Sequence, residues 1–176
     1  MNIELDDLFY VHAVGVIGGS IWSFGSTECK NGSYTRITWP EKIIKYPGSV
    51  SISISEIGAP TTPESFEKLT AEELENKIKR GFENLKIIEE KAKKKYQSDL
   101  EPTAKINRKK TAKVFINGEA VFEVEGEHIQ FQVDYKKNGN FLFSIYGSEL
   151  SSDKEPVGKY DVKLSKSTEL LLRFGS

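Results

Sequence analysis

The chain has 176 residues, a length that suits one domain with a sizeable buried core. Hydrophobic residues make up 38% of it and charged residues 29%, which excludes an intrinsically disordered chain. Its 25 basic and 26 acidic side chains nearly cancel, so nothing in the overall charge attracts nucleic acid or membranes, and electrostatic contacts must come from local patches.

The N-terminal segment MNIELDDLFY is acidic where a secretory signal would be basic, and no stretch approaches the ~20 apolar residues of a membrane span. Cys29 is the only cysteine, which rules out an intrachain disulfide and fits a reducing compartment. We therefore expect a cytoplasmic protein.

Residues 1–60 read as a first antiparallel sheet region. In AVGVIGGSIWSFGS (residues 13–26) the glycines have neither the lysine of a P-loop nor a helix after them, so Gly18-Gly19 is predicted to be a hairpin turn and Gly25 a bulge or bend. Further along, SVSISISEI alternates serines with Val50, Ile52 and Ile54, the pattern of a strand with one polar and one buried face.

Three Asn-Gly pairs predict hairpins with type I′ turns, because both residues tolerate positive φ. They are Asn31-Gly32, Asn117-Gly118 and Asn138-Gly139, each flanked by strand-like residues. Antiparallel pairing is therefore expected on both sides of the middle of the chain.

Residues 61–98 have a helical period instead. Thr70 and Glu73 form a capping box, and apolar residues then recur every three or four positions from Leu74 to Tyr96, which predicts a long amphipathic helix with one buried stripe.

Residues 103–176 read as a second antiparallel region, in which Ile129, Phe131, Val133 and Tyr135 share one strand face. Residues 167–174 fit either a strand or a short helix. The sequence thus predicts an α+β fold in a single domain over 1–176. Two antiparallel β-meanders of about four strands each are separated by one long helix.

Catalytic patterns are sparse. His12 and His128 are the only histidines, and their spacing with Cys29 matches no metal-binding motif, so we expect no metal, no cofactor and no enzymatic activity. We interpret the protein as a binder. Its candidate partner-binding residues are the carboxylates Glu119, Glu123, Glu125, Glu127 and Asp134, which would attract a basic protein surface.

The alternative is a single-stranded DNA or RNA-binding protein, in which lysines contact phosphates and aromatic rings stack on bases. The residues for that function are Trp22, Trp39, Lys94, Arg108, Lys109 and Lys110. Binding of this kind would fall steeply with salt, whereas a protein complex would be indifferent to oligonucleotides.

The order of four strands, a long helix and four strands resembles the Whirly family of single-stranded nucleic-acid-binding proteins. Residues 109–118, KKTAKVFING, come nearest to that family's strand motif and depart from it. In general character the chain is also similar to bacterial immunity proteins of contact-dependent growth inhibition systems, some of which resemble the Whirly fold. That resemblance implies a cytoplasmic protein without catalysis that binds and blocks one cognate toxin, a nuclease being one candidate.

Overall fold

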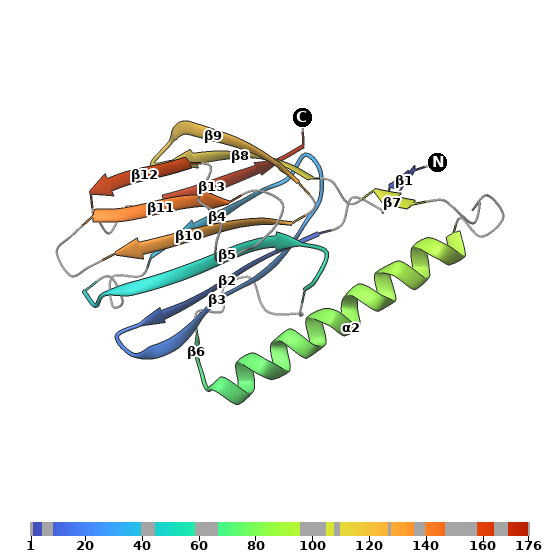
Figure 1. Cartoon of the computed structure of the whole chain (residues 1–176), viewed down its shortest axis with the longest axis horizontal. Helices are drawn as coiled ribbons and strands as arrows, with labels where there is room; N and C mark the ends of the chain where they lie inside the picture. Colours follow the sequence, from blue (N-terminus) through green and yellow to red (C-terminus); the bar gives the residue numbers. More distant parts are fainter. Residues whose placement is uncertain are drawn as a thin grey trace.

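The computed structural model describes residues 2–4, 9–39, 45–58, 67–95, 105–107, 110–126, 128–135, 140–146, 158–163 and 169–175. Over these residues the chain forms mostly antiparallel sheets and one helix, α2 (Ala71–Lys95), so the predicted α+β class is confirmed (Figure 1). The strands are β1 (Asn2–Glu4), β2 (Phe9–Ile17), β3 (Ser20–Cys29), β4 (Tyr34–Thr38), β5 (Gly48–Ser55), β6 (Glu67–Leu69), β7 (Lys105–Asn107), β8 (Lys110–Ile116), β9 (Glu119–Gly126), β10 (Ile129–Tyr135), β11 (Asn140–Tyr146), β12 (Gly158–Lys163) and β13 (Glu169–Phe174).

Two main sheets draw strands from both halves of the chain. The large sheet has seven strands in the order β12-β11-β10-β5-β2-β3-β6, and the small sheet has four in the order β4-β13-β8-β9. A separate parallel pair joins β1 to β7. The strands before and after the helix therefore interleave in space, with β5 pairing with β10 and β4 with β13.

The two sheets enclose one hydrophobic core. The alternation predicted for β5 and β10 is confirmed, since Val50, Ile52, Ile54, Ile129 and Val133 are each 0% exposed. From the small sheet the core receives Ala112, Val114, Val124, Leu170, Leu172 and Phe174. Burying one such large apolar side chain contributes about 1.5–3 kcal/mol, so this shared core is the main force that holds the sheets together.

Residues 169–174, which the sequence left open between helix and strand, form β13 at the centre of the small sheet. Leu170 and Leu172 point into the core at 0% exposure, while Arg173 on the other face is exposed. This alternation requires the strand period of two, which a helix would not satisfy.

Two of the predicted turns are confirmed. Gly18 and Gly19 have φ angles of 57° and 81° and connect β2 to β3. Asn117 and Gly118, at 51° and 82°, connect β8 to β9, as a type I′ hairpin requires. The pair Asn138-Gly139 lies outside the described residues, although β10 and β11 on either side of it pair antiparallel.

The hairpin predicted at Asn31-Gly32 is wrong. The strands that flank it, β3 and β4, belong to different sheets. Gly32 has a φ of 88°, and its N–H donates to the Phe174 carbonyl at 2.9 Å, while the Phe174 N–H donates to the Ser33 carbonyl at 2.9 Å. This turn therefore carries the chain from the large sheet to the small one, where it packs beside the end of β13.

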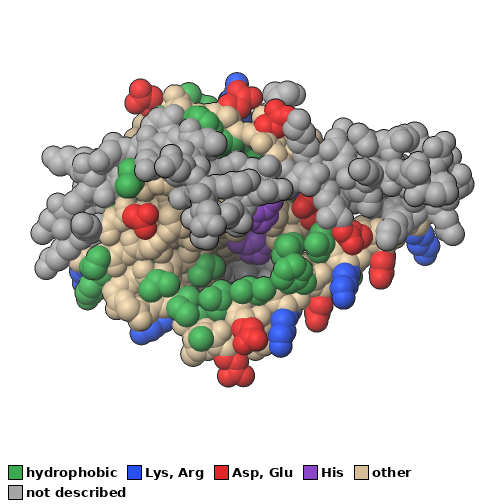
Figure 2. Space-filling view, in the orientation of Figure 1, with side chains coloured by type: hydrophobic (Ala, Val, Ile, Leu, Met, Phe, Trp, Pro, Cys, Tyr) green, Lys and Arg blue, Asp and Glu red, His purple; other side chains and the backbone are tan. Residues whose placement is uncertain are grey.

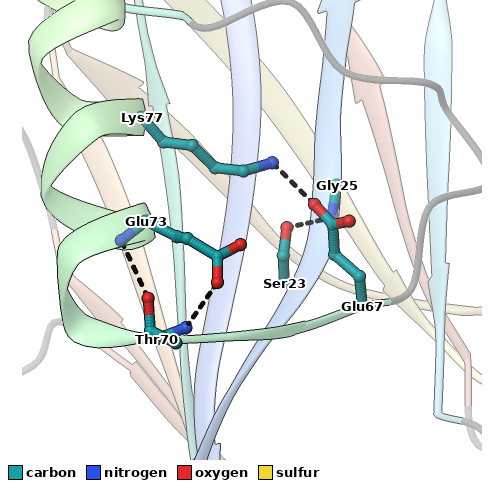
Figure 3. A network of polar contacts seen from close by, with 6 residues as sticks. All are labelled: Ser23, Gly25, Glu67, Thr70, Glu73 and Lys77. Atoms are coloured by element: carbon teal, nitrogen blue, oxygen red, sulfur yellow. Dashed lines mark hydrogen bonds and ion pairs between the residues drawn. The ribbon is translucent and has the colours of Figure 1, made fainter.

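Helix α2 begins at the predicted capping box. The Glu73 N–H donates to Thr70 Oγ1 at 3.1 Å and the Thr70 N–H donates to Glu73 Oε1 at 3.4 Å (Figure 3). The predicted apolar stripe is only partly buried, because Ile78 and Phe82 are 51% and 52% exposed. The helix thus runs past the large sheet with a space beneath its first turns.

Candidate functional site

A pocket of about 410 Å³ lies between α2 and the outer face of the large sheet. Figure 2 shows it as a hollow with histidine side chains at its back and hydrophobic side chains along its helix side. It is lined by His12, Val14, Ser23, Gly25, Ser26, Ser51, Ser53, Ser55, Ile57, Leu74, Lys77, Ile78, Gly81, Phe82 and His128.

Serines form the floor of the pocket on β5. Because side chains alternate along a strand, burying Val50, Ile52 and Ile54 in the core turns Ser51 and Ser53 toward the helix. The Ser51 hydroxyl donates to the Gln132 carboxamide oxygen on β10 at 2.8 Å. The floor is therefore polar and is held by contacts across the sheet.

A β-bulge brings the serines of β3 onto the same face. Residues 23 and 26 are three apart and would point to opposite sides of a regular strand. The register with β2 shifts between Ala13 and Val14, so that Ala13 pairs with Gly25 and Val14 with Ser23. Gly25 has a φ of 101°, and its N–H donates to Ser23 Oγ at 3.1 Å (Figure 3). The predicted bulge at Gly25 is thus confirmed, and it adds two hydroxyls to the floor.

Apolar side chains of α2 form the wall facing the serines. Leu74, Ile78 and Phe82 follow one another at intervals of four residues on the side of the helix that faces the sheet. Because Ile78 and Phe82 remain about half exposed, solvent reaches this wall. The pocket therefore has one apolar and one hydrogen-bonding side.

Two sets of contacts fix the helix above the sheet. Near its start, Lys77 Nζ lies 2.9 Å from the Glu67 carboxylate on β6 (Figure 3). Near its middle, Asn84 Nδ2 donates to the Gly58 carbonyl at 2.5 Å. There α2 also comes so close to the segment after β5 that a Cβ at Gly81 would lie 2.7 Å from Ile57 Cγ2.

His12 of β2 lies at the back of the pocket with its tautomer set by a backbone contact. Its Nε2 lies 2.5 Å from the Ile57 carbonyl oxygen, which only accepts, so Nε2 carries the proton. Burial lowers the pKa of His12 and the nearby charge of Lys77 lowers it further, while the bond to Ile57 opposes both. The imidazole is therefore neutral at neutral pH and presents Nδ1 as an acceptor.

His128 lies beside a buried ion pair that joins the two sheets. Glu56, just after β5, pairs with Lys110 at the start of β8, and their side chains are 9% and 6% exposed. Burial lowers the pKa of His128, the Glu56 carboxylate raises it and Lys110 lowers it. Both histidines that line the pocket thus resist protonation.

The one cysteine of the chain does not line the pocket. Cys29 belongs to the core, on the opposite face of the sheet from His12, and burial raises the pKa of its thiol to about 11. Among the described residues, no three His, Cys, Asp or Glu side chains gather closely enough to hold a metal ion.

The predicted carboxylates do not form one surface. Glu119, Glu123 and Glu125 are exposed on β9 of the small sheet. Asp134 is exposed on β10 of the large sheet, where the Gln132 amide donates to it at 3.4 Å. Because the inner faces of both sheets share one core, Glu123 and Glu125 lie on the outer face of the small sheet and Asp134 lies on the outer face of the large one, while Glu119 pairs with the core residue Ile116 at the start of β9. Glu127 lies outside the described residues.

The residues predicted for nucleic-acid binding are also dispersed. Trp39 is 2% exposed, with its ring between Phe24 and Phe143 in the core, so it has no face for a base. Trp22 packs against the same core. Lys110 is buried beside Glu56, whereas Lys94 is exposed near the end of α2. Arg108 and Lys109 lie outside the described residues.

The pocket is the feature that sequence patterns missed. The serines of β5 were recognisable as the polar face of a strand, but that pattern also fits a face exposed to solvent. The one further signal is the apolar stripe on α2, because its residues Ile78 and Phe82 are not covered by the sheet.

Within the described residues there is no helix with both the length and the apolar character to cross a bilayer.

Comparison with protein-family models, with curated proteins and with solved structures finds no match for this chain.

Proposed function

We propose that the chain is a protein-binding protein without catalytic activity that neutralises a cognate bacterial toxin by direct complex formation in the cytoplasm. One observation carries this proposal. Among the described strands, β9 is the last in the order of the small sheet, and its Glu119, Glu123 and Glu125 are exposed to solvent.

The edge position of β9 supports recognition of a polypeptide. A strand at the end of a sheet has backbone N–H and C=O groups on its outer side that a partner strand can bind. Since β8 occupies the inner side of β9, a partner would approach from the side away from β8. Backbone pairing would supply affinity there, and the side chains of β9 would supply specificity.

The charge on β9 supports a basic partner. Glu123 and Glu125 are two residues apart and project from the same face of the strand. Lys113 of β8 lies opposite Glu123 of β9, so part of the negative charge of β9 is balanced within the sheet. Glu125, opposite Thr111, continues the negatively charged surface along the strand. Clustered carboxylates speed the encounter with a basic surface and select against acidic ones.

The experiment is to co-express this chain with the product of the neighbouring upstream gene, to measure host survival, and to test for a complex by size-exclusion chromatography. We expect survival only when this chain is present, and a complex of equal stoichiometry. Death of the host in its presence, or separate elution of the two proteins, would refute neutralisation.

A matched pair of variants then tests the contact surface. Glu119→Lys, Glu123→Lys and Glu125→Lys together should abolish the complex. Glu75→Lys, Glu83→Lys and Glu90→Lys change the net charge equally from exposed positions of α2 and should leave the complex intact. Equal affinity of both triple variants would show that β9 is not the contact surface.

A further inference from the structure

We propose that the pocket between α2 and the serine face of the large sheet binds an uncharged amphipathic small molecule. Its apolar part would lie against Leu74, Ile78 and Phe82, and its hydroxyl or carbonyl groups would face Ser23, Ser51 and Ser53. This activity is separate from the toxin binding proposed for β9.

The two sides of the pocket require a molecule with two kinds of surface. A purely apolar ligand would take water away from the serine hydroxyls and the His12 ring without replacing their hydrogen bonds, and each such loss is costly. A fully polar ligand would leave the apolar helix wall in water. A ligand with one apolar and one hydrogen-bonding side satisfies both surfaces.

The charge of the lining favours a neutral ligand. Among the described residues that line the pocket, Lys77 is the one lysine or arginine, and its ammonium already pairs at 2.9 Å with Glu67, which is not part of that lining. His12 is neutral, with Nε2 donating to Ile57. An anion would therefore enter without a counter-ion of its own, and a cation would find no carboxylate among the described lining residues.

The dimensions favour a small molecule over a protein segment. About 410 Å³ lies within the range of ~300–1,000 Å³ typical of small-molecule sites. The wall extends from Leu74 to Phe82, which at about 1.5 Å per residue is about 12 Å. The helix is joined to β6 at Lys77 and to the segment after β5 at Asn84, so the wall is held in place before a ligand arrives.

The test uses the neutral fluorophore N-phenyl-1-naphthylamine, titrated into the full chain at pH 7.5. We expect enhanced fluorescence with one saturable site per chain. Displacement then compares 1-octanol with octanoate, which match in chain length and differ in charge. We expect 1-octanol to displace the fluorophore and octanoate to be at least about tenfold weaker, since its charge would be buried without a partner.

Three variants locate the site. Phe82→Ala should weaken binding of the fluorophore at least about fivefold by removing part of the wall. Ile87→Ala is the control, because Ile87 is exposed to a similar degree on the same helix, at 48%, and does not line the pocket. Ser53→Leu should abolish binding by filling the floor. Far-UV circular dichroism and a thermal melt establish that each variant is folded.

Four results would overturn the proposal: no saturable binding of the fluorophore, displacement by octanoate as effective as by 1-octanol, equal weakening by Phe82→Ala and Ile87→Ala, or full binding by a folded Ser53→Leu variant. None of these measurements depends on the toxin complex, so their failure and that of the β9 proposal are separable.

Discussion

Gly81 of α2 lies directly against Ile57, where a Cβ at position 81 would come within 2.7 Å of the Ile57 Cγ2 methyl group. Ile57 belongs to the segment that follows β5, and Ile78 and Phe82, the helix residues nearest this contact in the pocket wall, remain about half exposed. The absence of a side chain at position 81 therefore allows α2 to pack this closely against Ile57 at the edge of the pocket.

Gly81→Ala should destabilise the protein even though alanine is the better helix former. The gain in helix propensity is ~1 kcal/mol, whereas overpacking a close contact costs about 1–3 kcal/mol. We expect a lower melting temperature, measured by circular dichroism. Asn76→Ala, at an exposed position of the same helix, is the control and should raise it slightly. An increase with Gly81→Ala as large as with Asn76→Ala would mean that Ile57 moves aside at little cost.

Lys110→Met should destabilise the protein by about 3–5 kcal/mol, because it leaves the buried Glu56 carboxylate without its counter-ion. The double variant Glu56→Leu and Lys110→Met removes both charges and should recover most of that loss. Urea unfolding of the wild type, both single variants and the double variant gives the coupling energy. If Lys110→Met alone left stability unchanged, the ion pair would not join the sheets in solution.

Thr70→Ala should cost about 1 kcal/mol of stability, because it removes the Thr70 hydroxyl that accepts from the Glu73 N–H. Thr70→Ser keeps a hydroxyl at the same place and should stay close to the wild type. Thermal melts of the two variants make the comparison. A serine variant as unstable as the alanine variant would point to the threonine methyl group instead of the cap.

Stability should fall as the pH drops below about 6.5, the ordinary pKa of histidine. The pKa values of His12 and His128 are lowered in the folded state. In that range the unfolded chain therefore binds protons that the folded chain resists. This destabilising effect fades as the pH rises past about 6.5, because the unfolded chain then loses these protons as well. Burial is the main cause of both lowered pKa values. The bond to the Ile57 carbonyl raises the pKa of His12 and Lys77 lowers it, while Glu56 raises the pKa of His128 and Lys110 lowers it.

His12→Gln isolates the first of these histidines, since its amide can still donate to the Ile57 carbonyl. Unfolding free energies of the variant and the wild type should be measured between pH 5 and 7.5. We expect a smaller loss for the variant as the pH falls. The same slope for both proteins would show that His12 titrates normally in the folded state.

The elements that depend on near neighbours in the chain were predictable. The capping box of Thr70 and Glu73, the type I′ turn at Asn117-Gly118 and the alternation of β5 each involve residues within a few positions of one another. The hairpin predicted at Asn31-Gly32 was wrong because this dipeptide fits any turn with a positive φ at glycine. Whether the turn forms a hairpin depends on where β4 pairs, and β4 pairs with β13, more than a hundred residues away in the chain.

For the candidate site as well, the local features were predictable from the sequence and the contacts between distant segments were not. By itself, the sequence determined which strand faces are polar, where the helix begins and which of its residues are apolar, because these follow from period, capping and side-chain chemistry. The tertiary structure decided that α2 stands over the serine face, that the bulge at Gly25 turns Ser23 and Ser26 toward it, and that Trp39 and Lys110 are buried. The physical reason is that these outcomes depend on contacts between distant segments, to which local propensity contributes almost nothing.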